Sequence, residues 1–438
     1  MTEKKRVVTR SGKIKAGGFN FTSEMIPNFG ENEFIRSYQQ KAWESFQEKD
    51  LPKRDEEAWR RTDLRQFSRK SFSLPNGSSS KNIDTEFILN TEELAGKVIL
   101  SNQDAILDMD TELSSKGVIF TDLKTAINEN PKELEEAMGK LISSDKDIFT
   151  SMTAAFAQNG VFLYIPKGIK VEKPFHSILK ISGAETANFS HLIVWMEENS
   201  SATLIHEFAS EKETSMHSGI VEINIGPSAN LNMIELQVFG KKIWNFTHEH
   251  ARIEKDGKFN WVYGSFGSHL TKSFIEIDLV GEGAEGKMSG LYFSDGDQHF
   301  DHDTQQNHLA PNTISDMLFK GALKDESRSV WQGMIYVAPG AQGIDGYQSN
   351  PNLILDDNAR ADSIPGLEIL ADDVRCSHGA TIGNIDQNEV FYLNSRGIPE
   401  KDAEKLLVAG FFDPVIEKVN THEIKEKLRK MILEKLEK

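Results

Sequence analysis

Cysteine is almost absent from this sequence, because Cys376 is the only one among 438 residues. A single thiol excludes a disulfide framework, and it excludes a self-contained zinc or iron–sulfur site made of cysteines. The scarcity fits a reducing, intracellular compartment, where proteins do not depend on disulfides. Any metal or cluster chemistry at Cys376 therefore needs ligands of another residue type or from another chain.

Long hydrophobic runs are absent as well. Stretches such as 191–196 and 405–412 are the most apolar, and they are far shorter than the ~18 residues that a membrane span needs. Residues 4–10 include four basic side chains, but no apolar run follows them, so the pattern is not that of a secretory signal. We therefore expect a cytoplasmic protein with no membrane partner.

Basic residues are outnumbered: 50 Lys and Arg stand against 67 Asp and Glu, which gives a net charge of −17. This balance argues against binding to the phosphate backbone of nucleic acids and against docking on an anionic membrane. The length is enough for about two to four domains at roughly 100–200 residues each, and for a large buried core.

Residues 1–150 are predicted to form an N-terminal, mainly helical region. Residues 32–48 place apolar side chains close to helical spacing, and residues 131–141 resume that pattern with Pro131 suited to the first turn. Residues 75–82 are polar and include Asn76-Gly77 and three serines, which indicates a linker.

Residues 151–398 follow a period of two and form the predicted β core. Short β-rich runs recur there without a convincing helix between them: 161–165, 192–195, 220–225, 233–238, 274–279 and 318–323. Polar turns followed by a small residue recur too, with 27 residues from Ala202 to Ala229 and 55, about twice as many, from Ala229 to Ala284. Imperfect repeats of this length favour stacked β-coils, so the predicted fold class is mainly β with a β-solenoid core. A β-sandwich or barrel is the alternative.

Residues 399–438 are predicted to form a C-terminal helical region. Pro399 suits a first helical turn, and Pro414 is expected to end that helix. A last helix carries one apolar stripe, made of Ile424, Leu428, Met431, Ile432 and Leu436. We expect the helical regions on both sides of the core to cover the exposed strand edges at the two solenoid ends.

A Gly-x4-Gly-Lys pattern from Gly281 to Lys287 resembles the front of a phosphate-binding loop. Met288 stands where the magnesium-binding Ser or Thr belongs, and the following residues indicate a strand where a helix is required. We therefore interpret the pattern as a turn of the solenoid.

Two histidine groups could bind a metal. His248 and His250, with Glu254, resemble the metal motif of cupin barrels, but the glycine spacing differs and a polar pair on a solvated strand is favoured. A second group, which could hold iron, manganese or zinc, comprises His299, Asp301, His302, Asp303 and His308. For this group we favour a structural role, in which the side chains satisfy buried backbone polar atoms between coils.

The triplet Cys376-Ser377-His378 is the most informative motif. A lone cysteine is usually a small core residue. In an extended strand, however, Cys376 and His378 project to one side, so the imidazole could stabilise a thiolate. Asp372 and Asp373 nearby would oppose that effect. Spacing alone leaves both interpretations open.

Several segments in the last third of the chain resemble one known family. Runs 347–355, 357–362, 365–369, 371–383 and 391–397 resemble the SufD branch of the SufB/SufD family, which belongs to the SUF iron–sulfur cluster assembly system. The match is dense over residues ~300–412 and looser elsewhere, including 51–62. The block that begins Cys376-Ser-His-Gly-Ala-Thr distinguishes SufD-like chains from the SufB-like paralogue. Pro351 departs from the family pattern within a Ser-Asn-x-Asn stretch.

The resemblance implies a right-handed parallel β-helix with N-terminal and C-terminal helical regions. It implies a non-catalytic scaffold subunit that pairs with a SufB-like paralogue and binds a SufC-type ATPase through residues 399–438. The apolar residues of that region are Leu406, Leu407, Phe411 and Phe412. Cys376 and His378 would be ligands of a transient iron–sulfur cluster or iron shared with SufB, and no cofactor is expected in the isolated chain. A homodimer in isolation is an alternative to the paralogue pair.

Two other function classes fit a β-solenoid or its histidines. A β-helix polysaccharide lyase is disfavoured by the net charge of −17 and by the lack of a secretory pattern. A cupin-like metalloenzyme would use His248 and His250 as metal ligands.

Overall fold

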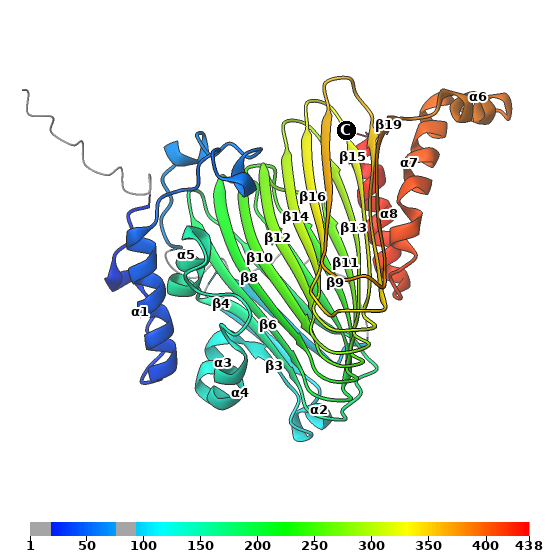
Figure 1. Cartoon of the computed structure of the whole chain (residues 1–438). Helices are drawn as coiled ribbons and strands as arrows, with labels where there is room; N and C mark the ends of the chain where they lie inside the picture. Colours follow the sequence, from blue (N-terminus) through cyan, green and yellow to red (C-terminus); the bar gives the residue numbers. More distant parts are fainter. Residues whose placement is uncertain (1–18, 76–92, 103, 438) are drawn as a thin grey trace, which may run out of the picture.

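The computed structural model describes residues 19–75, 93–102 and 104–437. Residues 4–10 and the predicted linker, apart from Pro75, lie outside these ranges. The centre of the molecule is a β-solenoid of about eight turns, as the sequence predicts (Figure 1). Each turn contributes one strand to each of two long sheets.

The ten-stranded sheet contains β1 (Gly96–Ser101), β2 (Asp104–Met109), β5 (Phe175–Ile181), β7 (Ser201–Ser210), β9 (Asn230–Val238), β11 (Lys258–Ser265), β13 (Glu285–Ser294), β15 (Ile314–Leu323), β17 (Ile344–Ile354) and β19 (Val374–Asn384). The nine-stranded sheet contains β3 (Ile119–Asp122), β4 (Asn159–Ile165), β6 (Ala187–Met196), β8 (Ser215–Ile225), β10 (Ile243–Ile253), β12 (Leu270–Leu279), β14 (His299–His308), β16 (Arg328–Val337) and β18 (Arg360–Ile369). All pairings are parallel except β1 with β2 and β3 with β4.

The length of one coil agrees with the sequence repeat, but the phase does not. Ser201 pairs with Asn230 and Asn230 with Lys258, which are offsets of 29 and 28 residues. Ala202, however, pairs with Leu231 and not with Ala229. Ala229 lies in the turn before β9, whereas Ala202 lies within β7, so the two alanines do not occupy equivalent positions of the repeat.

The turns are sharp because one residue in each adopts a left-handed conformation. Asn199, Ser228 and Asp256 have φ of 58°, 55° and 54°. Gly283 has φ of 73° at the equivalent corner of the next coil. The Gly-x4-Gly-Lys pattern is therefore a solenoid corner followed by β13, as the sequence analysis favoured.

Both faces of the central strands are buried. Along β8, Val221, Ile223 and Ile225 point into the core between the sheets. The other face lies under the N-terminal region, where Thr153 donates a hydrogen bond to Ser218 at 2.8 Å. Continuous burial of this kind explains why several strands appear in the sequence as unbroken apolar runs.

The N-terminal region covers the outer face of the nine-stranded sheet (Figure 1). Its helices are α1 (Glu33–Glu48), α2 (Thr111–Ser115), α3 (Leu123–Glu129), α4 (Pro131–Ala137) and α5 (Ile148–Phe156), with short 3-10 turns at Ser23–Met25, Glu57–Trp59 and Phe67–Arg69. The region also contains β1, β2 and β3, which the sequence does not indicate, because short strands are specified by their distant partners. α5 crosses the expected boundary at residue 150. All nine of its residues are buried, so it lacks an amphipathic period.

The C-terminal region contains α6 (Gln387–Ser395), α7 (Glu400–Ile416) and α8 (His422–Glu437). α6 begins before the expected boundary at residue 399. α7 continues two residues past Pro414. Pro414 has no N–H to donate to the Gly410 carbonyl, but Gly410 is exposed, so this carbonyl is not buried without a partner. α7 and α8 cover the outer face of the ten-stranded sheet, where Phe412, Leu428 and Ile432 are buried against β9, β11 and β13.

The two ends of the solenoid are finished differently. At the N-terminal end, β2 and β3 close the sheets with antiparallel pairing. At the C-terminal end, the expectation of a helical cap is wrong, because α7 and α8 pack on the side of the solenoid and not over its end. None of the helices in the described part of the chain has the length and apolar character that a membrane span requires.

Candidate functional site at the open end of the solenoid

Strands β18 and β19 form the open end. Within the described residues β18 pairs only with β16, and β19 pairs only with β17, so each has one unpaired edge (Figure 1). Apolar side chains are exposed beside these edges, including Leu370 and Ile382, each 51% exposed. A row of unpaired N–H and C=O groups is a template for pairing with another strand.

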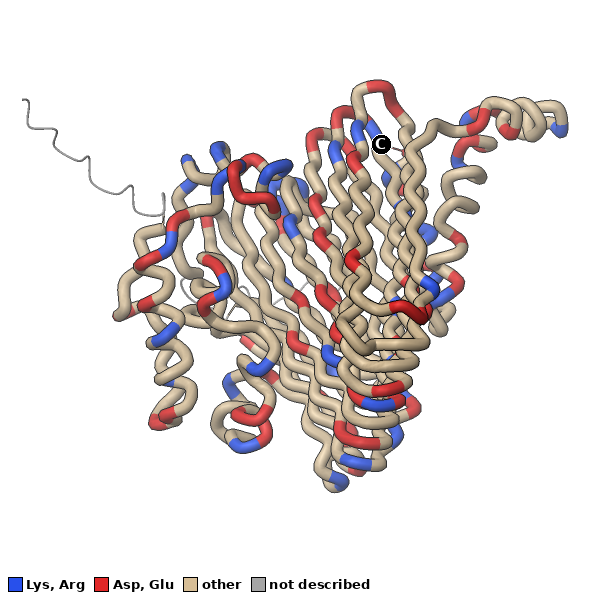
Figure 2. Tube along the Cα trace, in the orientation of Figure 1, with Lys and Arg blue, Asp and Glu red and all other residues tan. Residues whose placement is uncertain are grey.

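The β19 edge lacks the usual protection of an edge strand. Proteins commonly place charges or prolines on such edges to prevent pairing with other chains. In β19, Arg375 is the only charged residue and proline is absent. The other edge strand, β18, does carry such residues, namely Arg360, Asp362, Pro365 and Glu368. Figure 2 shows that acidic residues gather at the turns. The features of β19 are typical of an edge that pairs with a partner.

Pro351 lies in β17, beneath the open end. The β15–β17 ladder breaks there, since pairing passes from Leu318–Ser349 directly to Gly321–Asn352. The Asn350 side chain compensates for part of this loss, because its Nδ2 donates a hydrogen bond of 2.9 Å to the Phe319 carbonyl. β19 pairs with β17 without interruption, so the departure from the family pattern does not disturb the strand that carries Cys376 and His378.

Cys376 is half-buried on β19 and lies opposite Gly346 of β17. A Cβ at Gly346 would lie 3.2 Å from Cys376 Sγ and 3.2 Å from His308 Nε2, so the glycine leaves the thiol and this imidazole on either side of one small space. His308 is 68 residues from Cys376 in sequence. Only the stacking of coils brings it near, and the sequence offers no signal of that proximity.

The thiol is not activated within this chain. Burial raises the pKa of Cys376, and the negative charge of Asp345 raises it further. Burial lowers the pKa of His308 to about 4, and its two ring nitrogens lie 2.8 Å from the hydroxyls of Thr313 and Ser315. At neutral pH a neutral thiol therefore lies near a neutral imidazole. The expected thiolate would have to be favoured by a metal or a partner.

His378 is exposed and lies opposite Gln348, which is fully buried inside the solenoid. Residues two apart on a strand share a face, so Cys376 and His378 both lie on the face that continues the solenoid interior. His378 is exposed because no further coil covers it. The structure thus brings the two predicted ligands to one face of the open end.

The predicted ATPase contact residues on α7 are only partly accessible. Leu406 is 54% exposed, while Leu407 and Phe411 are half-buried. Phe412 is fully buried and packs against Phe293 of β13, so its inclusion in a surface contact is wrong. The sequence could not show this, because both faces of α7 carry apolar residues.

α6 carries exposed aromatic residues that are not among the predicted ATPase contact residues. It extends away from the solenoid, and its only buried residue is Val390 (Figure 1). Phe391 is 73% exposed and Tyr392 is 56% exposed. The sequence could have indicated Phe391 and Tyr392, because they begin the run 391–397, which resembles the SufB/SufD family.

Comparison with known proteins identifies the family. The model of the SufBD protein N-terminal region matches residues 19–176, and the model of the SufBD core domain of SUF system FeS cluster assembly matches residues 179–411. The chain belongs to the SufBD family. Relatives include an iron–sulfur cluster assembly SufBD family protein of Staphylococcus saprophyticus, at 28% identity, and iron–sulfur cluster assembly protein SufB of Bacillus subtilis, at 29%. Each match covers 70% of this chain and 66% of the relative.

The cupin-like histidines of this SufBD family chain hold the N-terminal region in place. His248 Nε2 lies 2.8 Å from the carboxylate of Asp147, which caps the N-terminus of α5. His250 Nδ1 lies 3.1 Å from the Leu141 carbonyl. The two imidazoles share a strand face, as predicted, but they contact different groups and do not converge on one point.

The second histidine group makes structural contacts, but in the described residues these are with other side chains and not with the backbone polar atoms that were expected. Asp301 accepts hydrogen bonds from Thr62 and from the buried Lys272, the latter at 2.9 Å. His302 faces the opposite way, into the solenoid, among the rings of Tyr263 and Tyr292. Within the described residues, one group of His, Cys, Asp and Glu could hold a metal ion, and it comprises His250, Glu276 and Asp278.

Proposed function

We propose that this chain is a SufD-type scaffold subunit that pairs with a SufB-type paralogue through the open end of its solenoid. The observation that carries the proposal is the unpaired β19 edge with Cys376 and His378 on one face. The block beginning at Cys376 supports the SufD assignment. In this proposal the chain catalyses no reaction itself and acts in the cytoplasm.

Cys376 and His378 would contribute ligands to a transient iron–sulfur cluster or iron, which is the cargo of the complex. A coordinating metal favours the thiolate, which offsets the raised pKa of Cys376. Imidazole is a borderline ligand that suits iron. Two ligands from one chain leave at least two coordination positions for the partner. The isolated chain would therefore hold little iron.

The SufC-type ATPase would bind at α6 and the adjoining part of α7. Phe391, Tyr392 and Leu406 are the exposed apolar side chains there. Aromatic anchors on a surface helix commonly supply most of an interface's binding energy. α7 then has two roles, since it also covers the ten-stranded sheet together with α8.

Pairing through the open end is tested with one substitution at each end of the solenoid. Ile382→Lys places a charge on β19, where the side chain is 51% exposed. Ile106→Lys is the matched control, because Ile106 is 50% exposed on β2 at the opposite end. We expect Ile382→Lys to reduce co-purification with a SufB-type partner at least tenfold, while Ile106→Lys leaves it unchanged. Equal co-purification of both variants would contradict the proposal.

A further inference from the structure

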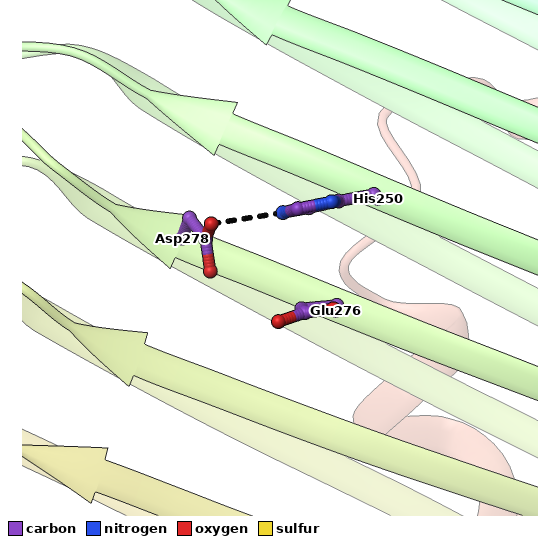
Figure 3. A group of neighbouring side chains, drawn as sticks. All are labelled: His250, Glu276 and Asp278. Carbon is purple, nitrogen blue, oxygen red and sulfur yellow. Dashed lines mark ion pairs between the residues drawn. The ribbon is translucent and has the colours of Figure 1, made fainter. Parts of the chain in front are cut away.

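A histidine and two carboxylates meet on the outer face of the nine-stranded sheet, away from β18 and β19. His250 lies on β10, and Glu276 and Asp278 lie on the neighbouring β12 (Figure 3). Each side chain offers an atom within 4.8 Å of the others. Their side chains are 13%, 29% and 19% exposed, so the group is accessible from solvent and yet held within the sheet surface.

The His250 ring has an acceptor on each side. Its Nδ1 lies 3.1 Å from the Leu141 carbonyl, which can only accept, so Nδ1 carries the proton. Nε2 lies 2.9 Å from Asp278 Oδ2, but it is buried and makes no hydrogen bond of acceptable geometry. In the neutral imidazole, a nitrogen lone pair therefore faces a carboxylate. Either a second ring proton or a cation must lie near Nε2.

The carboxylates are oriented by a neighbouring amide. Asn307 Nδ2 donates to Glu276 Oε1 at 2.8 Å and to Asp278 Oδ1 at 2.7 Å. Gln305 in turn donates to Asn307 Oδ1 at 2.8 Å, which fixes the orientation of the amide. The second oxygen of Asp278 is left on the side of His250, and that of Glu276 lies 3.8 Å from Lys146 Nζ. Outer groups that orient ligands in this way, including a carbonyl on the far nitrogen of a histidine, are typical of metal sites.

We propose that His250 Nε2, Asp278 and Glu276 bind a divalent first-row transition-metal ion. One imidazole and two carboxylates suit zinc, manganese or ferrous iron. Lys146 Nζ, 3.8 Å from Glu276 Oε2, is the cation that the metal would displace, and its contact is weak. The site is independent of the proposed cluster ligands, because it shares no residue with Cys376 and His378. A bound ion would link β10 and β12 to the segment at Leu141.

The competing explanation is an ion pair between imidazolium and carboxylate. Asp278 and Glu276 raise the pKa of His250, although burial opposes them. A plain ion pair would hold the Leu141 segment through Nδ1 in the same way, but it would show no metal dependence. Zinc binding therefore separates the two explanations.

The test uses the full chain with Cys376→Ser and His378→Ala, so that the open end does not contribute ligands. Equilibrium dialysis against Zn²⁺ should show one ion per chain, and His250→Ala or Asp278→Asn should remove it. Asn307→Ala should weaken binding roughly 10–100-fold, as loss of an orienting group does. His269→Ala is the matched control, since His269 lies 3.6 Å from the single carboxylate Asp297 and should bind zinc like the parent.

Thermal unfolding with chelator and with Zn²⁺ supplies the second measurement. Zinc should raise the melting temperature of the parent and of His269→Ala, but not that of Asp278→Asn. Melting in chelator checks that each variant is folded. No zinc uptake by the parent, or equal uptake by His250→Ala, would overturn the proposal in favour of the ion pair or of adventitious binding.

Discussion

Gly346 and Cys376 are register partners in the β17–β19 ladder, and the missing side chain at Gly346 leaves room between the thiol and His308. Only glycine at position 346 leaves this space open, because any other residue would place a Cβ in it. The position of the thiol at the open end thus depends on a residue of the coil beneath it.

Gly346→Ala should disturb the thiol. The added Cβ would lie 3.2 Å from Sγ and from His308 Nε2, so both neighbours would have to shift by a few tenths of an ångström. We expect a loss of about 1–2 kcal/mol in the free energy of unfolding, as for mild overpacking, and a lower cluster yield in the assembled complex. Urea denaturation measures the first effect. Gly383→Ala, whose Cβ would meet no described atom within 4 Å, is the control and should change neither quantity.

The apolar stripe of α8 should be essential to stability. Leu428 and Ile432 are 0% and 1% exposed against the ten-stranded sheet. Leu428→Asp or Ile432→Asp buries an unpaired carboxylate and should cost about 3–5 kcal/mol. Leu433→Asp lies on the same helix at 38% exposure and should stay within about 0.5 kcal/mol. If all three variants melt alike, α8 does not pack as described.

ATPase binding should be tested by point substitution and not by deletion. Removing everything after Gly397 would expose the outer face of the ten-stranded sheet, since α7 and α8 cover it. Phe391→Ala combined with Tyr392→Ala should instead weaken SufC-type binding at least about tenfold, because two exposed anchors are lost. The fold should be unchanged. Titration calorimetry measures the affinity, and Leu433→Ala should bind like the parent.

Glu249 should make the chain less stable as pH rises. Burial raises the pKa of Glu249 to about 7, and its Oε1 accepts a hydrogen bond from Thr247. The pKa is above its unfolded value of ~4.3, so the protonated form is favoured in the folded chain. The protonated carboxyl therefore contributes to the free energy of unfolding. This stabilisation is fully present below pH ~4.3 and is lost as pH rises through about 7. Glu249→Gln should therefore stabilise the chain at pH 8 by about 1–3 kcal/mol. Chemical denaturation at pH 5 and pH 8 measures the difference, which should be small at pH 5.

The sequence predicts the solenoid better than it predicts its ends. Each β-rich run lies within a strand, from 161–165 in β4 to 318–323 in β15, because alternation is a local property. The sequence does not predict α5, because complete burial removes the amphipathic period that would indicate a helix. The sequence does not predict the open end either. The apolar stripe that includes Leu428 would suit a helix packed over the end of the solenoid as well as one packed along its side. Phe412 shows the same limit, as an apolar residue is equally suited to a core or an interface.

The metal candidates show where local patterns mislead. His248 and His250 match a motif by spacing, yet the partners of His250 are Glu276 and Asp278, on the next strand of the sheet. Coil stacking, which the sequence expresses only as a weak repeat, brings these residues together. Cys376 and His378 are the opposite case, because their two-residue spacing on one strand is sufficient to place them on one face.

Cluster formation by the assembled complex tests the central claim most directly. The complex is co-expressed with SufB-type and SufC-type partners, and cluster absorbance is normalised to intact heteromer. Cys376→Ser and His378→Ala should keep the heteromer but lower the absorbance at least about tenfold, since losing a ligand costs no less than losing an orienting group. His378→Ala should lower the cluster absorbance at least as much as Cys376→Ser does, because the remaining thiol has no second ligand beside it. Ser377→Ala, on the opposite strand face, should retain the parent yield. A parental cluster yield from His378→Ala would contradict the account.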